Sequence, residues 1–363
     1  MGAGGSPSIE RPSFENCFQG LAESYEMKLV VGVDGGGTKT LAAACTLEGE
    51  VVGVGRGGGS NWEGMGADRA AGTITRATEA ALADAGAHLD DLLQGHMTLG
   101  GIDWPEDVPR METALRKVGW DCPLTIENDS FGALRACAPE GHGIGTAAGS
   151  GVCCCIIRPD GEKYFYGAFT DLGGGMNISG QVFYSVLREE DGRGQATALT
   201  PELLKATGCD SVVDLVYAAH RKGEFVSKRV TDPILFRCAR EGDPIAVDIV
   251  RGFGQELALA ARTLIRRYGL EKSDPVVAAA GSLFVKTGPL LFDAFREDVL
   301  KTAPRARVML ADQPPALGAV RGALESAGSG TPKVWGRLRE SATEAGWFRE
   351  DMGLTAKGED ESE

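Results

Sequence analysis

The chain has 363 residues, of which 43% are hydrophobic and 24% are charged, and its formal net charge at pH 7 is -14. This length suits one large or two medium domains, and the apolar content is ample for a buried core. The acidic balance argues against binding of nucleic acid or of an anionic membrane, because both need basic patches. It does not exclude a phosphorylated ligand, which a local loop can bind within an acidic protein.

The cysteine spacing predicts a cytoplasmic protein, and a targeting role of the N-terminal extension stays open. The nine cysteines include no CxxC pair and no regular framework, which favours buried reduced thiols over disulfides. The four histidines have no metal-ligand spacing, and no apolar run approaches a membrane span of about 20 residues. Residues 1–26 lack the basic-then-apolar order of a signal peptide, so we expect a flexible extension there. We also expect a tail over 331–363, with a disordered acidic end.

The first third of the chain predicts strands and helices in alternation. Apolar and β-branched runs over 28–34, 40–47 and 51–58 predict a three-stranded meander whose first turn is rich in glycine. Ala, Ile and Leu at three- and four-residue spacing predict a helix over 66–86. The elements predicted next are a strand over 95–102, a helix over 107–119, a strand over 123–130 and a helix over 130–138.

The opening pattern then recurs in residues 143–169, which read as strand, small-residue turn, strand, Pro-Asp-Gly turn and strand. The two meanders share little residue identity, so they indicate a weak internal duplication of structure. The elements predicted after them are helices over 179–191, 233–242 and 244–269, a strand over 275–284, a helix over 287–301, a strand over 306–312 and a helix over 315–328. This order predicts two α/β domains, with the last helix packed on the first domain.

The first turn of the first meander lies in the sequence GVDGGGTKT at 32–40. It is not a P-loop, which needs GxxxxGK[ST], and not a Rossmann loop, which opens a helix. Gly35, Gly36 and Gly37 would let backbone N–H groups approach phosphate oxygens that a Cβ would keep away. The alternative is an ordinary glycine-rich hairpin turn.

Polar side chains flank these glycines. Thr38 can add a hydroxyl donor for a bound phosphate, and Lys39 can add a cation. Asp34 offers the hard oxygen ligands that Mg²⁺ prefers, so we expect it to hold this ion through water. The sequence therefore predicts a phosphate site at this turn.

Eight motifs, taken in order, resemble the BadF/BadG/BcrA/BcrD ATPase family and, within it, the N-acetylglucosamine kinases. The resemblance runs from about Lys28 to about Ala327. The motifs are GVDGGGTKT (32–40), GGSNW (58–62), END (127–129), AAGSGV (147–152), DLGGGMNISG (171–180), EGDPIA (241–246), AAGSLF (279–284) and PPALGAVRGAL (314–324). The first motif is specific to the family, and the others gain weight from their order and spacing.

The resemblance implies an α/β fold of two actin-like ATPase (ribonuclease H-like) domains with a nucleotide cleft between them. In that fold the phosphate loops are the turns of two facing β-hairpins, which accounts for a glycine-rich loop between two strands. The implied N-terminal domain comprises 27–129 and 315–330, and the implied C-terminal domain comprises 130–314. ATP and Mg²⁺ are the implied cofactors.

Two further segments match nucleotide-binding positions of the family. By resemblance, Gly149, Ser150 and Gly151 form the second phosphate turn, and Ser150 contacts an ATP phosphate. Gly281 and Ser282 match the pair that contacts adenosine. Plain turns without a ligand remain the alternatives at both places.

Asp129 is the catalytic base that the resemblance implies. A sugar kinase needs a carboxylate near the attacking hydroxyl, to accept its proton as the bond to phosphorus forms. The alternative is that Asp129 only caps the helix that follows it, although Asn128 or Ser130 could cap that helix instead.

Sugar recognition is predicted for residues near the end of the first meander. Ser60 and Asn61 match a Thr/Ser-Asn step whose Asn contacts the sugar in the family. The alternative for Asn61 is an ordinary loop residue after a glycine run. Asp103 ends another predicted strand and could approach the same cleft, so its role stays open.

The segment 171–179 resembles the part of these kinases that lines the sugar pocket, with Asp171, Gly173 and Asn177 as predicted substrate contacts. It is also similar to the second phosphate loop of heat-shock ATPases, but that loop precedes a strand and here a helix is predicted. The Trp and the Asp-Glu pair of the kinase segment are absent from this sequence. The departure leaves the identity of the sugar open.

Three functions remain on these grounds. The first is an ATP-dependent sugar kinase that acts on an amino sugar, N-acetylglucosamine or glucosamine. The second is an activator ATPase of a dehydratase, for which Cys153, Cys154 and Cys155 would have to reach an iron–sulfur cluster, although strand alternation turns at least one of them into the core. The third is a sensor of sugar or nucleotide without turnover. The expected partner is a small-molecule sugar, without nucleic acid or membrane, and a homodimer is left open.

Overall fold

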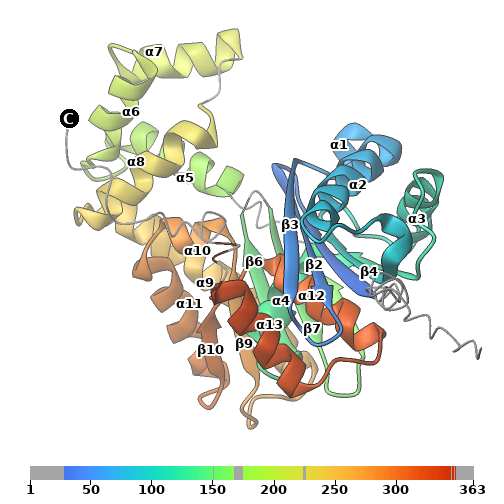
Figure 1. Cartoon of the computed structure of the whole chain (residues 1–363). Helices are drawn as coiled ribbons and strands as arrows, with labels where there is room; N and C mark the ends of the chain where they lie inside the picture. The colour runs from blue at the N-terminus through green and yellow to red at the C-terminus, as the bar shows by residue number, and fades with distance from the viewer. Residues whose placement is uncertain are drawn as a thin grey trace, which may run out of the picture.

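The computed structural model describes residues 28–149, 151–166, 175–223 and 226–344, together with 346 and 348. These residues form two five-stranded sheets with helices packed around them (Figure 1). No helix in this described part is long and apolar enough to cross a membrane. The predicted extension over 1–26 and the acidic end 355–363 lie outside the described residues.

The first sheet joins the N-terminal meander to two parallel strands. Its strands are β1 (Leu29–Gly35), β2 (Lys39–Thr46), β3 (Val51–Gly58), β4 (Leu92–Leu99) and β5 (Leu124–Asn128). They lie in the order β3-β2-β1-β4-β5, antiparallel within the meander and parallel from β1 through β4 to β5. β1 is buried along nearly its whole length because helices cover both faces of the sheet.

The second sheet repeats this arrangement. Its strands are β6 (Gly143–Ala148), β7 (Val152–Ile157), β8 (Lys163–Tyr166), β9 (Val276–Ala280) and β10 (Arg307–Leu310). β6, β7 and β8 form an antiparallel meander, and β9 and β10 extend the sheet in parallel from β6. Read from β8 to β10, the strand order is that of the first sheet, which confirms the predicted internal duplication.

Helices of the first half and of the C-terminal end pack on the first sheet. They are α1 (Trp62–Met65), α2 (Ala67–Ala83), η2 (Leu89–Asp91), α3 (Asp107–Lys117), α4 (Asp129–Cys137), α12 (Pro315–Ser326) and α13 (Pro332–Glu344). α2 and α3 share a core with one face of the sheet, and α12 and α13 share a core with the other face. The predicted return of the last helix to the first domain is therefore confirmed for α12.

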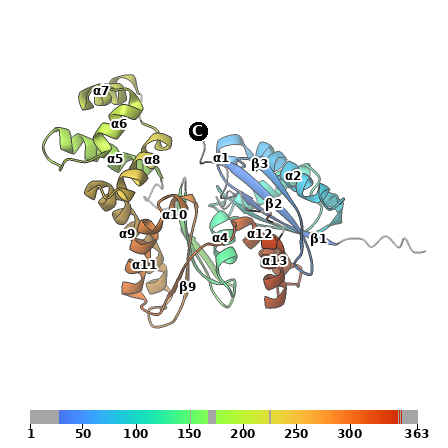
Figure 2. The same ribbon diagram turned by 60° about the vertical axis from the view of Figure 1, so that its left-hand side comes forward.

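α4 and α12 lie at the centre of the molecule, between the two sheets (Figure 2). Phe131 and Leu134 of α4 pack against Cys155 and Ile157 of β7 in a small separate core. α4 thus begins where β5 of the first sheet ends, and it packs against the second sheet. Any side chain at the start of α4 lies at the junction of the two halves.

The tail predicted over 331–363 is wrong for its first part. Residues 332–344 form α13, and Trp335, Leu338 and Ala342 are buried in the core that α12 shares with the meander. Their spacing of three and four residues is that of an amphipathic helix. The high charge of this segment concealed the pattern.

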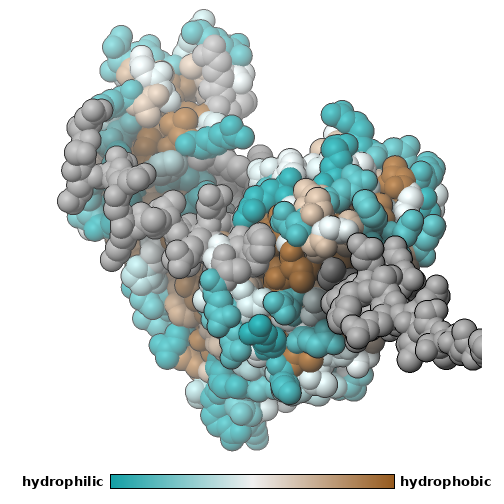
Figure 3. All heavy atoms as spheres, in the orientation of Figure 1, coloured by the Kyte–Doolittle hydropathy of each residue, from teal (hydrophilic) through white to brown (hydrophobic). Residues whose placement is uncertain are grey.

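The remaining helices belong to the second half. They are α5 (Gly175–Glu190), α6 (Leu199–Thr207), α7 (Val212–Tyr217), η3 (Ala218–Lys222), α8 (Lys228–Arg240), α9 (Pro244–Arg267), α10 (Ser282–Lys286) and α11 (Pro289–Thr302). α5 to α8 form an insert that extends away from the sheets (Figure 1), and hydrophobic surface shows on it (Figure 3). α6 and α7 were not among the predicted elements.

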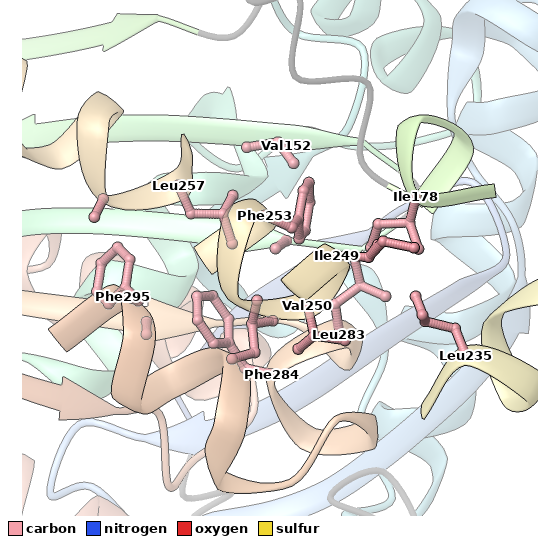
Figure 4. Packing of buried hydrophobic residues seen from close by; sticks show 14 of the residues in the cluster. Val152, Ile178, Leu235, Ile249, Val250, Phe253, Leu257, Leu283, Phe284 and Phe295 are labelled. Atoms are coloured by element: carbon pink, nitrogen blue, oxygen red, sulfur yellow. The ribbon is translucent and has the colours of Figure 1, made fainter. Parts of the chain in front are cut away.

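Phe253 of α9, Phe284 and Phe295 lie in the large core under the second sheet (Figure 4).

Close backbone packing holds α12 against α4. A Cβ on Gly318 would lie 1.9 Å from the carbonyl oxygen of Gly132, so no side chain fits there without moving one helix. We expect Gly318→Ala to lower the free energy of unfolding by about 1–3 kcal/mol or more, as overpacking does. Urea unfolding of the purified variant measures this difference.

A matched control is Gly252→Ala in α9, where a Cβ would meet nothing within 4 Å. This change is expected to raise stability by up to about 1 kcal/mol, because alanine is the better helix former. Equal effects of the two substitutions would contradict the close packing of α12 on α4.

Candidate active site

The first predicted phosphate loop is the turn between β1 and β2. The Gly36 N–H donates to the carbonyl oxygen of Lys39 at 2.9 Å and closes the hairpin. Gly37 and Thr38 are exposed, and a Cβ on Gly37 would meet nothing within 4 Å. The backbone of the turn is therefore open to a bound group, and the exposed Lys39 side chain and the half-buried Asp34 flank it.

Neighbouring strand ends hold this turn in place. The carbonyl oxygen of Gly36 accepts from the N–H groups of Ser60 at 2.9 Å and Asn61 at 3.2 Å. The carbonyl oxygen of Gly35 accepts from the Gly100 N–H at 2.7 Å. The turn is thus fixed from the ends of β3 and β4, so its amides are preorganised.

Ser60 and Asn61 lie beside the first turn, and their side chains make hydrogen bonds with nearby residues. The Ser60 side chain is completely buried, and its Oγ accepts from Thr40 Oγ1 at 2.8 Å. A Cβ on Gly35 would lie only 2.3 Å from that Oγ, so Ser60 lies under the turn and supports it. Asn61 is half-buried and caps α1, with its Oδ1 accepting from the Glu63 N–H at 2.9 Å.

Asn128, not Asp129, caps α4. Its Oδ1 accepts from the Ser130 N–H at 3.0 Å and from Ser130 Oγ at 2.7 Å. Its Nδ2 donates to Asp103 Oδ1 at 3.0 Å, which places Asp103 beside the start of the helix. Because the cap is provided by Asn128, the capping alternative does not account for the carboxylate of Asp129.

The Asp129 carboxylate lies between the two predicted phosphate turns. The position that a Cβ on Gly100 would occupy is 3.6 Å from Asp129 Oδ2 and 3.7 Å from Gly36 Cα, so Oδ2 is on the side of the first turn. Asp129 Oδ1 is 3.8 Å from Sγ of Cys153, which follows Gly151 of the second turn by two residues. The carboxylate therefore contacts the β6–β7 hairpin directly and lies on the side of the first turn.

The surroundings of Asp129 suit a proton acceptor. Burial raises the pKa of Asp129 from 3.8 to about 6, and the nearby charge of Asp103 adds to the rise. The Cys153 thiol and the Ser130 N–H act in the opposite direction. Burial together with Glu63 and Asp107 also raises the pKa of Asp103. A base with a pKa just below neutrality is ionised at pH 7 and still holds a proton well, as general-base catalysis requires.

The second predicted phosphate turn lies against the predicted adenosine pair. The Gly149 N–H donates to the carbonyl oxygen of Gly151 at 2.9 Å in the β6–β7 hairpin. Gly281 has φ +102°, and a Cβ there would lie 2.3 Å from the carbonyl oxygen of Ala148. A Cβ on Gly149 would lie 3.8 Å from Ser282 Oγ. The structure therefore brings Gly281 and Ser282 directly onto this turn.

Some predicted positions lie beyond what the structure describes. Ser150, Asp171 and Gly173 are outside the described residues, and of Asn177 only the backbone, in α5, is described. Two surface hollows lie elsewhere: one of about 250 Å³ beside α5 and α7, lined in part by Leu187 and Val213, and one at the end of α2. We place the candidate site at the two turns instead. The glycine turns offer backbone N–H groups and Asp129 offers a carboxylate, whereas a hollow alone offers only space.

The cysteines of β7 do not gather into a cluster. Cys154 and Cys155 are fully buried and belong to different cores, on opposite faces of the strand. Burial raises the pKa of both thiols, to about 12 for Cys154 and further for Cys155. Among the described residues, no group of three or more His, Cys, Asp or Glu side chains is arranged to hold a metal ion.

A buried ionic cluster behind the site was missed by the sequence reasoning. Glu127 accepts from His96 Nε2 at 2.9 Å and from Lys163 Nζ at 2.7 Å, and it also pairs with Arg135. Burial alone would raise the pKa of Glu127, but the His96 hydrogen bond and the two positive charges hold it well below its usual range. Lys163 belongs to β8 and Glu127 to β5, so the cluster ties the two sheets together next to Asp129.

Comparisons with known proteins find similar sequences and similar folds. A model of the BadF/BadG/BcrA/BcrD ATPase family matches residues 31–323. The chain is 24% identical over 300 residues to the N-acetylmuramic acid/N-acetylglucosamine kinase of Clostridium acetobutylicum. The matched region covers 81% of this chain and 97% of that kinase.

Solved structures share the fold. A candidate N-acetylglucosamine kinase from Chromobacterium violaceum matches with a TM-score of 0.63 and 22% identity, over 81% of this chain and 98% of that one. A ROK family glucokinase from Streptomyces griseus, solved with glucose and AMPPNP, matches with a TM-score of 0.53 and 19% identity. This match covers 82% of this chain and 99% of the glucokinase chain. The predicted α/β fold of two actin-like ATPase domains is thus confirmed.

Proposed function

Since the chain belongs to the BadF/BadG/BcrA/BcrD ATPase family, we propose that it is an ATP-dependent kinase that phosphorylates a hydroxyl of an amino sugar. The similarity to a kinase named for N-acetylmuramic acid and N-acetylglucosamine supports this substrate class. The observation that carries the proposal is the position of Asp129, a carboxylate between two glycine turns and free of the helix cap. N-acetylglucosamine and glucosamine are the proposed substrates.

The first turn would bind ATP phosphates through its backbone. The open space beside Gly37 leaves room for a phosphate oxygen, and Thr38 and Lys39 add a hydroxyl and a positive charge. The second turn, from Gly149 to Gly151, would bind phosphate from the other side. Gly281 and Ser282, packed against that turn, would contact the adenosine.

Mg²⁺ fits the residues at the first turn. This ion binds ATP through phosphate oxygens and waters, and it takes only one or two carboxylates from the protein. Asp34 is half-buried at the end of β1, directly before the glycines, and provides one such carboxylate. When bound, the ion would neutralise charge on the phosphates.

Asp129 would act on the sugar hydroxyl. As the hydroxyl oxygen bonds to the γ-phosphorus and the bond to ADP breaks, the hydroxyl proton passes to the Asp129 carboxylate. Asn61 Nδ2 would donate to a sugar hydroxyl, while Ser60 supports the turn from below. Asp171, Gly173 and Asn177 remain proposed substrate contacts.

The test is ADP release from purified protein with Mg-ATP and, in turn, N-acetylglucosamine, glucosamine, N-acetylmuramic acid, N-acetylmannosamine, glucose or no sugar. We expect turnover to depend on an amino sugar, with a sugar phosphate formed in equal amount to ADP. ATP hydrolysis that does not depend on sugar, or no turnover with any sugar, would contradict the kinase proposal. Either result would favour an activator ATPase or a sensor.

A further inference from the structure

A hydrogen bond joins Cys153, a residue of the second sheet, to the side chain of Asp129. Cys153 pairs with Ala147 at the start of the β6–β7 hairpin and is half-buried. Its thiol donates to Asp129 Oδ1 over 3.8 Å, a length that suits the large sulfur atom and a weak donor. The contact joins the second phosphate turn to the carboxylate at the start of α4.

The thiol is a neutral donor in this position. Burial and the charge of Asp129 raise the pKa of Cys153 well above its ordinary value, so the proton stays on sulfur at neutral pH. A carboxylate can only accept, so the direction of the hydrogen bond is unambiguous. The thiol is for the same reason a poor nucleophile, and reactivity does not explain its place here.

The other groups that face Asp129 make this donor significant. Asp103, from the loop after β4, repels the ionised carboxylate, and the Ser130 N–H of α4 stabilises it. Cys153 of β7 stabilises the ionised carboxylate through its hydrogen bond, and Cys154 and Cys155 are the neighbouring thiols on that strand. Among the described residues, the groups that act on Asp129 therefore include a side-chain donor, Cys153, and an acidic neighbour, Asp103.

We propose that Cys153 is a positioning residue for the base: its thiol holds Asp129 Oδ1, turns Oδ2 toward the first phosphate turn and favours the ionised form. A thiol stabilises a carboxylate less than a hydroxyl does. Asp129 therefore stays ionised near neutral pH and remains a stronger base than an ordinary carboxylate. The catalytic meaning of this contact rests on the proposed kinase function, whereas the contact itself does not.

The variants are Cys153→Ala, which removes the donor, and Cys153→Ser, which keeps one. Cys209→Ala, which alters a thiol in the helical insert, is the matched control. Aspartate labelled with ¹³C at the carboxyl reports the pKa of Asp129 by NMR in the free protein, with the signal assigned from its loss in Asp129→Asn. We expect Cys153→Ala to raise this pKa from about 6 by about one unit, and Cys153→Ser to lower it or leave it in place.

The pH dependence of kcat/KM provides the second readout. In Cys153→Ala the acidic limb is expected to move up by about one unit, so the loss is about fivefold at pH 6, close to tenfold at pH 5 and small at pH 8.5. A purely structural role would lower activity evenly across pH. An unchanged Asp129 pKa in Cys153→Ala, or the same shift in Cys209→Ala, would overturn the inference while leaving the kinase intact. A shifted pKa in a protein without sugar-dependent turnover would support the Cys153–Asp129 contact and reject the kinase.

Discussion

Asp129→Asn is expected to lower kcat for sugar phosphorylation about 10²–10⁴-fold, the usual contribution of a positioned general base. Asparagine has nearly the same shape but cannot take the proton, so binding of ATP should change little. Steady-state ADP release and an ATP-analogue titration measure the two effects. The control is Asp68→Asn, which alters an exposed carboxylate paired with Lys117 and should leave kcat unchanged.

The same variant is expected to be more stable than the wild type at neutral pH. The folded-state pKa of Asp129, about 6, lies above the ordinary value of 3.8, so ionisation of the carboxylate opposes folding above pH 6. Below pH 4 the carboxyl is protonated in both states and has no such effect. Asp129→Asn should therefore raise the free energy of unfolding by about 1–3 kcal/mol at pH 8, and the gain should shrink as the pH falls toward 4.

Urea unfolding at several pH values tests this gain. A variant that loses turnover and also loses stability at pH 8 would contradict it, because the carboxylate would then be a stabilising group. A variant that keeps full turnover would remove Asp129 from the base role. The expected combination of lost activity and gained stability is typical of a residue held in place for chemistry.

Glu127→Ala is expected to destabilise the protein by about 3–5 kcal/mol. The substitution leaves the buried Arg135 with only its longer contact to Glu325 at 3.5 Å and Lys163 without its carboxylate, and a poorly compensated buried charge is costly. The control is Glu297→Ala, which breaks an exposed pair with Arg251 and should cost less than about 1 kcal/mol. Urea unfolding of both variants at pH 7 gives the comparison.

The stabilisation from Glu127 has a defined pH dependence. Its folded-state pKa is well below the ordinary value of 4.5, so the contribution is complete above pH 4.5 and is lost progressively as the pH falls below it. The stability difference between wild type and Glu127→Ala should therefore narrow below pH 4.5. A difference that stays constant from pH 7 to pH 3 would argue that Glu127 acts through packing rather than charge.

Glu127 also has a consequence for the active site. It precedes Asn128 and Asp129 on the same strand end, and Lys163 ties that strand end to β8 of the second sheet. Loss of the cluster would therefore make the proposed base, Asp129, more mobile and would also destabilise the fold. We expect the loss of kcat in Glu127→Ala to exceed what its unfolded fraction explains.

The sequence by itself determined the architecture and the place of the candidate site. Strand alternation and turn residues predicted both meanders, because periodicity is a local property that each segment carries alone. The glycine turn and Asp129 both follow strand ends, and parallel strands bring their carboxyl ends to one edge of a sheet. The candidate site could therefore be proposed at this edge before any packing was known.

Only the tertiary structure decided which atoms are in contact at the candidate site. Asn128, Asp129 and Ser130 were equivalent as caps in the sequence, and the choice of Asn128 depends on side-chain directions at the strand–helix junction. The supporting place of Ser60 and the approach of Cys153 depend on contacts between residues far apart in the chain. Such contacts leave no periodic trace in a sequence, because they depend on how two sheets and α4 meet in space.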